Sequence, residues 1–302
     1  MAEGAVDWRG LDVASVDFFH DTLIAPAEIT DRLLSYEVLV RTRERTRFPA
    51  EVLPGLPNLK LIAGTGCRQA NVDMDKAAEL GIEVMNTSGS RCRRNSTAEF
   101  AWAFIMGVSR HIAWEDRQIR EGRWQTRRAE GLGGNKLGIL GMGKLVLIFA
   151  GYGNYFDMDV IAWVPTSDAE RADENSVELV LWDELFSESD ILSIHLPLTD
   201  LSRGWVTARE FGLMKDSAFL VNTSRGPIVD ESDLITALSR GQIAGAALDV
   251  YDVEPVRADH PLLSLDNVLL APHLGYSTVG TIQVFMEQSL ENVREWLAGG
   301  VR

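Results

Sequence analysis

The stretch 137–146, LGILGMGKLV, decides the fold that the sequence predicts. Its apolar run, 137–140, predicts a buried strand that leads into the turn Gly141-Met142-Gly143. A strand, a tight glycine turn and the start of a helix form the setting of a dinucleotide-binding fingerprint. Gly141 would permit the turn, and Gly143 would let the backbone approach a pyrophosphate at the helix N-terminus. The stretch therefore predicts either such a site or a plain strand–turn–helix unit.

Two features next to this turn depart from the fingerprint. Its third glycine position holds Val146, whose two methyl groups are expected to push the helix away from the strand. The acidic residue that would bind the ribose of NAD is absent from the end of the next predicted strand, 159–163. Thr166 and Arg171 could contact the additional phosphate of NADP, but Asp168 would oppose it. The choice between NAD and NADP stays open.

The helix expected within 145–158 contains Gly151 and Gly153. Each glycine costs a helix up to about 1 kcal/mol relative to alanine. We therefore expect this helix to be short, bent or poorly ordered.

Strand-like and helix-like segments alternate along the rest of the chain, which predicts parallel sheets of the α/β class. The later strands are nearly continuous apolar runs, as in sheets that are covered on both faces. These strands are expected at 190–196, 218–224, 244–251 and 267–272. The earlier strands are expected at 13–19, 36–41, 59–66 and 82–87. The helices are expected at 27–35, 74–81, from a cap near Asn95 continuously to about Gly122, at 231–241 and at 279–298.

Length and composition limit the classes of protein to which the chain can belong. The 302 residues suit two domains rather than one compact core. With 29 Lys and Arg against 44 Asp and Glu, the net charge of −15 argues against nucleic acid and anionic membranes as partners. No signal peptide and no apolar run long enough to span a bilayer is visible, so a cytoplasmic protein is expected. Cys67 and Cys92 predict free thiols, and no metal site is expected.

Three polar residues lie shortly after successive predicted strands. Arg225 follows the strand 218–224, Glu254 follows 244–251 and His273 follows 267–272. Open α/β sheets bind their ligands at the carboxyl edge of the strands, so we expect the three side chains to converge.

Their chemistry suits the reduction of a 2-oxo acid. A guanidinium can hold a carboxylate through two hydrogen bonds and polarise the neighbouring carbonyl. An imidazole can deliver a proton to the forming alkoxide while a nicotinamide delivers hydride. A carboxylate beside the imidazole favours its charged form and fixes its orientation. Each residue alone has a plain alternative as a surface ion pair or a loop residue, but the ordered set favours catalysis.

With these residues the chain resembles the D-isomer-specific 2-hydroxyacid dehydrogenase family, in particular its phosphoglycerate dehydrogenase and hydroxypyruvate reductase-like members. The resemblance covers nearly the whole chain and is densest from Leu137 to Ser277. The matching motifs are LGILGMG (137–143), HLPLT (195–199), NTSRGPIVDE (222–231), GAALDVYDVEP (245–255) and APHLG (271–275).

The resemblance implies a role for each member of the set. Arg225 would bind the substrate, His273 would be the general acid/base and Glu254 its partner. Asp249 would face the nicotinamide carboxamide. The residues expected to contact the cofactor, NAD or NADP, are Gly141, Met142, Gly143, Lys144, Leu145, Thr166, His195, Pro197, Thr199, Thr223, Asp249 and Gly275. A homodimer is also implied, built through the helix near 98–120 and the arm that contains Trp124.

The resemblance further implies a Rossmann-like doubly wound parallel sheet and a smaller flavodoxin-like substrate domain that lacks its usual first strand. We expect residues 1–95 plus 279–302 to form the substrate domain and 96–278 the dinucleotide-binding domain. The turn 64–68 would hold the substrate carboxylate with its N–H groups. The substrate-binding residues are expected to be Arg41, Thr65, Gly66 and Arg68. The arginines near this turn predict either a small anionic substrate or a solvated basic patch.

Two functions remain open from the sequence. The first is an NAD(P)H-dependent enzyme that interconverts a 2-oxo acid and a D-2-hydroxy acid, suggested by the intact catalytic set. The alternative is a catalytically impaired relative that acts as a nucleotide-binding regulatory or scaffold protein, suggested by Val146 and the missing first strand. The sequence does not identify the side chain of the substrate.

Overall fold

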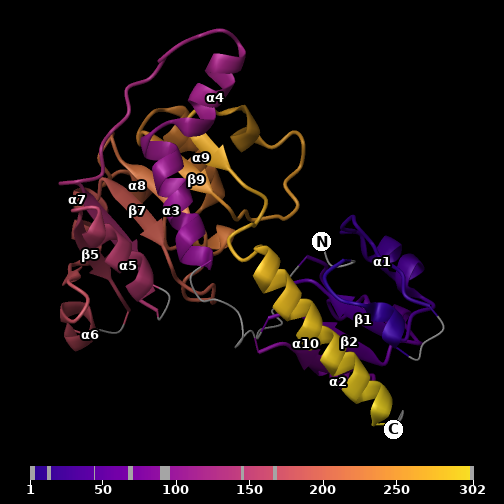
Figure 1. Cartoon of the computed structure of the whole chain (residues 1–302). Coiled ribbons are helices and arrows are strands. Elements are labelled where there is room, and N and C mark those ends of the chain that lie inside the picture. Colours follow the sequence, from indigo (N-terminus) through magenta and orange to yellow (C-terminus); the bar gives the residue numbers. More distant parts are fainter. Residues whose placement is uncertain are drawn as a thin grey trace. The chain divides into compact units, whose positions relative to one another are not determined.

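The structure is a computed structural model that describes residues 4–11, 15–43, 45–66, 71–88, 96–143, 146–165 and 169–299. The chain divides into two compact units, both visible in Figure 1. The first unit comprises Met1–Arg93 and Thr278–Arg302, and the second comprises Arg94–Ser277. No helix among the described residues is both long enough and apolar enough to cross a membrane.

A seven-stranded parallel sheet forms the centre of the second unit. Its strand order is β10-β9-β8-β7-β4-β5-β6. The strands are β4 (Lys136–Leu140), β5 (Asp159–Trp163), β6 (Glu178–Leu179), β7 (Ile191–Ile194), β8 (Phe219–Asn222), β9 (Gly245–Leu248) and β10 (Val268–Leu270). The chain builds outward from β4 to β6 in one direction and from β7 to β10 in the other. The order therefore reverses between β4 and β7, where doubly wound sheets bind nucleotides at the carboxyl edge.

Helices cover both faces of this sheet (Figure 1). Alternate residues of each strand enter opposite cores: Leu140 and Leu220 pack in one cluster, Ile139 and Val221 in the other. The first cluster involves α7, α8 and α9, and the second involves α3 and α5. The helical segments are α3 (Ser96–Ser109), α4 (Ile112–Arg120), α5 (Val146–Tyr155), α6 (Ala169–Asp173), α7 (Trp182–Glu188), α8 (Ala208–Phe211), η3 (Gly226–Ile228), α9 (Glu231–Ser239) and η4 (Pro261–Ser264). Burial on both faces explains the continuous apolar runs of the strands.

The single long helix expected to reach Gly122 is wrong, because the chain breaks between α3 and α4. His111 adopts a left-handed conformation with φ of 52°, which ends a helix. Its ring packs edge-on against Phe219 with centroids 6.2 Å apart. A tertiary contact thus overrides the helical pattern of the sequence.

Helix α5 is a regular helix of ten residues despite its glycines. At Gly153 an added Cβ would lie 2.9 Å from side-chain carbons of both Leu137 and Val160. The close helix–strand contact that the fingerprint normally makes at its third glycine is therefore made at Gly153. Val146, at the fingerprint position, is buried in the core with Phe149.

A three-stranded parallel sheet of order β1-β2-β3 lies in the first unit. The strands are β1 (Val38–Arg41), β2 (Leu61–Gly64) and β3 (Glu83–Asn86). The helical segments are η1 (Trp8–Gly10), α1 (Pro26–Leu33), η2 (Leu53–Gly55), α2 (Met74–Glu79) and α10 (Val279–Ala298). Ile62 packs in one core with residues of α1, η2 and α2, whereas Leu61 and Ala63 pack with Val293 of α10. Both faces of this small sheet are therefore covered.

The expected strand at 13–19 is also wrong for its described part. Residues 15–19 lie in no strand. Side chains hold the segment instead: the Tyr36 hydroxyl donates to Asp17 at 2.8 Å, and Phe19 packs edge-on against Tyr36. The apolar character of this segment serves contacts with the region of α1 rather than sheet pairing.

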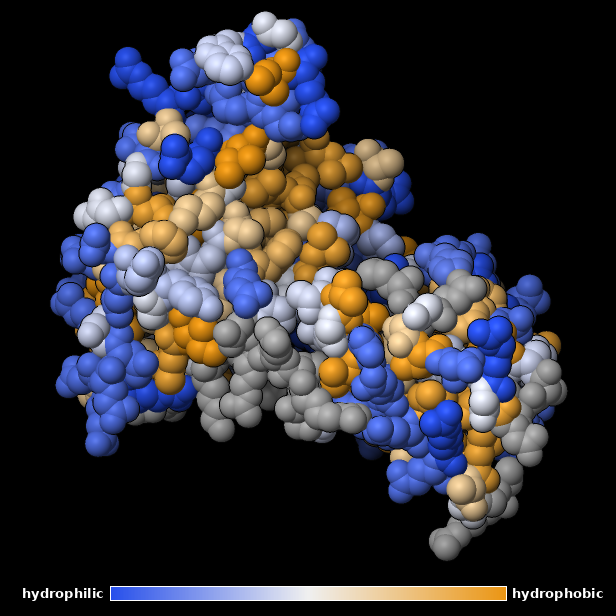
Figure 2. Space-filling view, viewed as in Figure 1, coloured by the Kyte–Doolittle hydropathy of each residue, from blue (hydrophilic) through white to orange (hydrophobic). Residues whose placement is uncertain are grey.

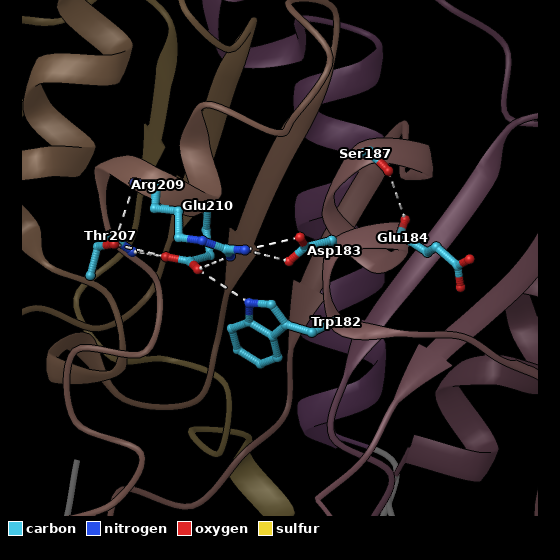
Figure 3. A network of polar contacts seen from close by, with 7 residues as sticks. All are labelled: Trp182, Asp183, Glu184, Ser187, Thr207, Arg209 and Glu210. Carbon is cyan, nitrogen blue, oxygen red and sulfur yellow. Dashed lines mark hydrogen bonds and ion pairs between the residues drawn. The ribbon is translucent and has the colours of Figure 1, made fainter.

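A buried carboxylate joins α7 to α8, as Figure 3 shows. Glu210, with a side chain only 7% exposed, accepts hydrogen bonds from Trp182 Nε1 at 3.1 Å and Arg209 Nη1 at 2.9 Å. Its other oxygen accepts from the N–H and the hydroxyl of Thr207 at 3.0 and 2.8 Å. Burial opposes the ionisation of Glu210, but these donors outweigh it and hold its pKa below its usual 4.5.

We expect Glu210→Gln to lower the free energy of unfolding at neutral pH by roughly 1–3 kcal/mol, because an amide cannot accept all four bonds. Since the folded pKa is depressed, the contribution of the carboxylate is present above the usual pKa and is lost as the pH falls through the folded value. Urea unfolding at neutral and acidic pH measures both effects. Asp200→Asn, at an exposed position outside the network of Figure 3, is the control, and an equal loss in Glu210→Gln at both pH values would contradict the assignment.

Candidate active site

The three residues of the predicted catalytic set lie at one edge of the large sheet. Arg225 follows β8, Glu254 follows β9 and His273 follows β10. These strands are direct neighbours and run parallel, so their carboxyl ends share an edge.

His273 and Glu254 form a direct pair. His273 Nδ1 lies 2.7 Å from Glu254 Oε2, and the side chains are 22% and 35% exposed. The second carboxylate oxygen of Glu254 accepts the N–H of Tyr251 at 3.1 Å, which fixes the carboxylate. Because a carboxylate only accepts, Nδ1 carries a proton and Nε2 is the nitrogen that can exchange one with a ligand.

Asp249, at the end of β9, holds the loop that carries His273. Its two carboxylate oxygens accept the N–H groups of Leu274 at 2.6 Å and Gly275 at 2.8 Å, and its carbonyl accepts the N–H of His273 at 2.9 Å. Burial raises the pKa of the Asp249 carboxyl, and the two N–H donors act in the opposite direction. His273 itself has a φ of 56°. Asp249 therefore shapes this uncommon loop conformation, a role that the sequence analysis did not assign to it.

Tyr251 is a second residue of the site that the sequence analysis missed. Its hydroxyl lies 3.2 Å from the carbonyl of Leu248 and 3.0 Å from that of Ala271. Burial and the nearby Asp249 raise the pKa of Tyr251 well above its usual value, so it stays a neutral donor. The side chain thus ties the ends of β9 and β10 together beneath Glu254 and His273. The available signal in the sequence was a tyrosine at the end of the predicted strand 244–251, two residues after Asp249.

The loop with Arg225 lies directly on the loop with Glu254. A Cβ added to Gly226 would be 2.1 Å from the carbonyl carbon of Tyr251. Asn222 fixes the turn itself, since its side chain donates to the carbonyl of Arg225 at 3.1 Å and accepts the N–H of Ser224 at 3.0 Å. Only glycine permits this backbone contact, so the two loops keep a fixed relative position.

The turn after β4 has features that suit a dinucleotide. Gly141 has a φ of 95°, and an added Cβ would lie 2.6 Å from Leu196 and 3.1 Å from the carbonyl of His195. Apart from its chain neighbours, none of the described residues has an atom within 4 Å of the Cβ position of Gly143, which leaves room for a ligand close to the backbone. Thr223, at the end of β8, has a buried hydroxyl without a hydrogen-bond partner among the described residues. The space beside Gly143 and the buried Thr223 hydroxyl fit a polar ligand that binds at the carboxyl edge of the sheet, where the strand order reverses.

His195 lies at the end of β7, next to this turn. Its ring packs on Phe149 with centroids 4.4 Å apart, and Nε2 lies 2.9 Å from Ser193 Oγ. Burial lowers the pKa of His195 to about 4, so the side chain is neutral at physiological pH. A neutral ring suits the predicted adenosine side better than a phosphate contact. The predicted Pro197 and Thr199 are exposed just beyond it.

The remaining predicted cofactor residues divide into two groups. Met142 is partly buried against the core that contains Phe149, and Gly275 is the N–H donor to Asp249 described above. Lys144, Leu145 and Thr166 lie outside the described residues, as does Arg68 of the predicted substrate site.

The other predicted substrate residues lie in the first unit and have partners there. The N–H of Thr65 donates to the carbonyl of Arg41 at 2.9 Å, and the N–H of Gly66 donates to Thr87 Oγ1 at 2.7 Å. Arg41 is buried, with Nη1 2.5 Å from Asn71 Oδ1. Thr65 and Gly66 thus use their N–H groups inside the unit, which does not match the anion nest expected there. Substrate binding by these residues stays a prediction.

Comparison with known proteins gives a consistent set of relatives. Residues 102–275 match the family described as D-isomer specific 2-hydroxyacid dehydrogenase, NAD binding domain. A glyoxylate reductase of Aeropyrum pernix is 38% identical over 93% of this chain and 84% of its own length. A D-3-phosphoglycerate dehydrogenase of Archaeoglobus fulgidus is 36% identical over 92% of this chain, which spans about half (52%) of that relative. The crystal structure of a phosphoglycerate oxidoreductase from Vibrio cholerae matches with a TM-score of 0.89 and 34% identity, covering 93% of this chain and 90% of that one.

Proposed function

Because the chain belongs to the D-isomer specific 2-hydroxyacid dehydrogenase family, we propose that it interconverts a 2-oxo acid and a D-2-hydroxy acid with NAD(H) or NADP(H). The observation that carries the proposal is the 2.7 Å pair of His273 and Glu254 at the sheet edge that also carries Arg225. Intact proton-transfer groups at this edge favour an enzyme over the impaired relative considered from the sequence.

Each residue of the set has a distinct task in the reduction. When bound, the reduced nicotinamide supplies a hydride to the carbonyl carbon of the substrate. His273 donates the proton on Nε2 to the carbonyl oxygen, which becomes the hydroxyl of the product. Glu254 stabilises the imidazolium before this transfer and keeps the ring in place. Arg225 binds the carboxylate of the substrate and polarises the adjacent carbonyl.

The cofactor would be held along the switch point by the chain's own groups. The turn Gly141–Gly143 would receive the pyrophosphate, His195 would border the adenosine, and the Thr223 hydroxyl would donate to the nicotinamide half. Between the end of β5 and Pro165 the chain has no carboxylate for the ribose of NAD. Calorimetric titration with NADH and NADPH compares the two cofactors directly.

The test of the function is turnover. The protein is incubated with NADH or NADPH and a panel of small 2-oxo acids that includes glyoxylate, hydroxypyruvate, pyruvate and a phosphorylated analogue. Oxidation of the cofactor with at least one acid is expected. Tight cofactor binding without oxidation by any acid would contradict the proposal and favour a regulatory or scaffold role. The cytoplasmic location expected from the sequence stays a prediction.

A homodimer is part of the proposal. Apolar side chains gather on the face of the second unit that carries α3 (Figure 2). Ile112 and Ile119 of α4, Leu263 of η4 and Trp124, which is 75% exposed, belong to the exposed apolar residues. Exposed apolar residues of this size are typical of protein–protein interfaces.

We expect Ile119→Glu with Trp124→Ala to convert the dimer to a monomer, because a charge at the interface core is costly. Light scattering coupled to size-exclusion chromatography measures the mass. Leu181→Glu is the control, because Leu181 is also apolar and exposed but lies at the N-cap of α7. A monomeric wild-type protein would contradict the proposed interface.

A further inference from the structure

A second carboxylate–histidine pair lies at the base of the loop that carries Glu254. His260 Nε2 is 3.0 Å from Oε1 of Glu231, the first residue of α9, and the side chains are only 18% and 21% exposed. The other oxygen of Glu231 accepts the N–H of Asp252 at 3.3 Å. One carboxylate thus holds residues 252 and 260, which flank the stretch containing Glu254.

The tautomer of His260 follows from its second contact. His260 Nδ1 accepts the N–H of Leu262 at 3.3 Å and caps η4. An accepting Nδ1 carries no proton, so Nε2 bears the hydrogen and donates it to Glu231. Leu262 is buried in the core of the second unit. His260 therefore connects the loop both to α9 and to a fixed point of the core.

The tie reaches the catalytic pair through a short stretch of backbone. Glu231 holds the N–H of Asp252, and the adjacent residue, Tyr251, donates its own N–H to Glu254. Gly226 packs directly against the same stretch of backbone: a Cβ added to Gly226 would lie 2.1 Å from the carbonyl carbon of Tyr251 and 2.7 Å from the nitrogen of Asp252. The backbone of Tyr251 and Asp252 therefore cannot shift toward Gly226. The position of the Glu254 carboxylate on His273 thus depends on a backbone that Glu231 holds in place.

Resting on the proposed function, we propose that Glu231 and His260 are positioning residues: they hold the loop 252–260 so that Glu254 stays hydrogen-bonded to His273. Neither side chain needs to touch the substrate or the cofactor for this role. Glu231 lies in the motif 222–231 and His260 in none of the motifs, and the sequence alone indicates no role for either.

The charged groups around the pair of Glu231 and His260 make the hydrogen bonds of this pair important. Burial, and then the charges of Glu231 and Asp230, raise the pKa of Asp252, whereas Arg203 and His260 act in the opposite direction. The carboxylates of Asp230, Glu231 and Asp252 therefore lie close together. Glu231 accepts hydrogen bonds from His260 Nε2 and from the N–H of Asp252. Loss of the His260 donor would leave Glu231 with only the weaker of its two bonds.

The test uses Glu231→Gln and His260→Phe, singly and combined, in the full-length protein. Gln keeps the shape of Glu231 but offers one acceptor instead of two, and Phe keeps the ring of His260 without its nitrogens. Asp259→Asn is the matched control, because Asp259 lies on the same loop and bonds only the exposed Arg257 in the described structure.

Each single variant is expected to lower kcat for 2-oxo acid reduction by roughly 10- to 100-fold, as a small misplacement of a catalytic group does. KM and the Kd for NADH are expected to change less than about 3-fold, since Arg225 and the glycine turn are untouched. The double variant is expected to be no worse than the more affected single variant. Asp259→Asn is expected to match wild type.

A second readout separates this inference from the proposed function. The Nδ1 proton of His273, observed by nitrogen-15 NMR of the imidazole, reports its bond to Glu254 without any turnover. This proton is expected to exchange faster with solvent, or its resonance to shift, in Glu231→Gln and His260→Phe. In Asp259→Asn the resonance is expected to be unchanged. A wild-type resonance in both variants would overturn the positioning role. If the resonance changes in the variants but the wild-type protein reduces no 2-oxo acid, the positioning role is supported and the proposed function is contradicted. If one variant does not fold, the other carries the same test.

Discussion

The variant His273→Gln is expected to lower kcat for 2-oxo acid reduction by about 10²- to 10⁴-fold, the usual contribution of a positioned general acid. The amide N–H of Gln can still donate a hydrogen bond to Glu254, so the loop held by Asp249 should keep its shape. It has no proton to release at neutral pH. The Kd for NADH should therefore change little.

Stopped-flow measurement of cofactor oxidation, together with calorimetry, separates the two quantities. His20→Gln, an exposed histidine of the first unit, is the control and should behave as wild type. A His273→Gln variant with wild-type kcat would mean that another group donates the proton. A variant with normal kcat but a greatly raised KM would assign His273 to binding instead of proton transfer.

The variant Gly226→Ala is expected to lower kcat/KM by roughly 10²-fold or more, because it changes the position of two catalytic loops at once. The added methyl group would lie 2.1 Å from the carbonyl carbon and 2.2 Å from the carbonyl oxygen of Tyr251, and 2.7 Å from the nitrogen of Asp252. All three atoms are backbone, so no side chain can move aside. The loop with Arg225 or the loop with Glu254 must shift, and overpacking of this kind also costs about 1–3 kcal/mol of stability.

Steady-state kinetics and urea unfolding of Gly226→Ala measure these two losses. Gly131→Ala is the matched control, since no atom of the other described residues, apart from its chain neighbours, lies within 4 Å of its Cβ position and its φ is outside the left-handed region. A Gly226→Ala variant that retains wild-type activity would show that the contact between the two loops has no influence on the site.

The secondary structure of the second unit could be predicted well because its signals are local. Strands buried on both faces must be continuously apolar, and the predicted 190–196 and 218–224 contain β7 and β8. In the first unit, the last helix was predicted at 279–298 and α10 runs over the same residues. Arg225, Glu254 and His273 could be placed at one edge because parallel strands bring their carboxyl ends together.

The errors have a common physical origin in contacts between residues far apart in the chain. The break at His111 coincides with a contact to Phe219, more than one hundred residues away, which no local periodicity reports. Val146 was expected to push the first turn of α5 away from the strand, but Val146 is buried in the core, and the close helix–strand contact occurs at Gly153, against Leu137 and Val160. The roles of Asp249 and Tyr251 depend on the pairing of β9 with β10, which sets which N–H and carbonyl groups they meet.

The measurement that tests the central claim most directly follows the transferred hydrogen. The protein is given a 2-oxo acid from the active panel and a reduced cofactor that carries deuterium at its transferable position, and the product is resolved on a chiral column. We expect a D-2-hydroxy acid with deuterium on the carbon that bears the new hydroxyl, and almost no product from His273→Gln. An L-configured product, an unlabelled product or equal product from His273→Gln would contradict it.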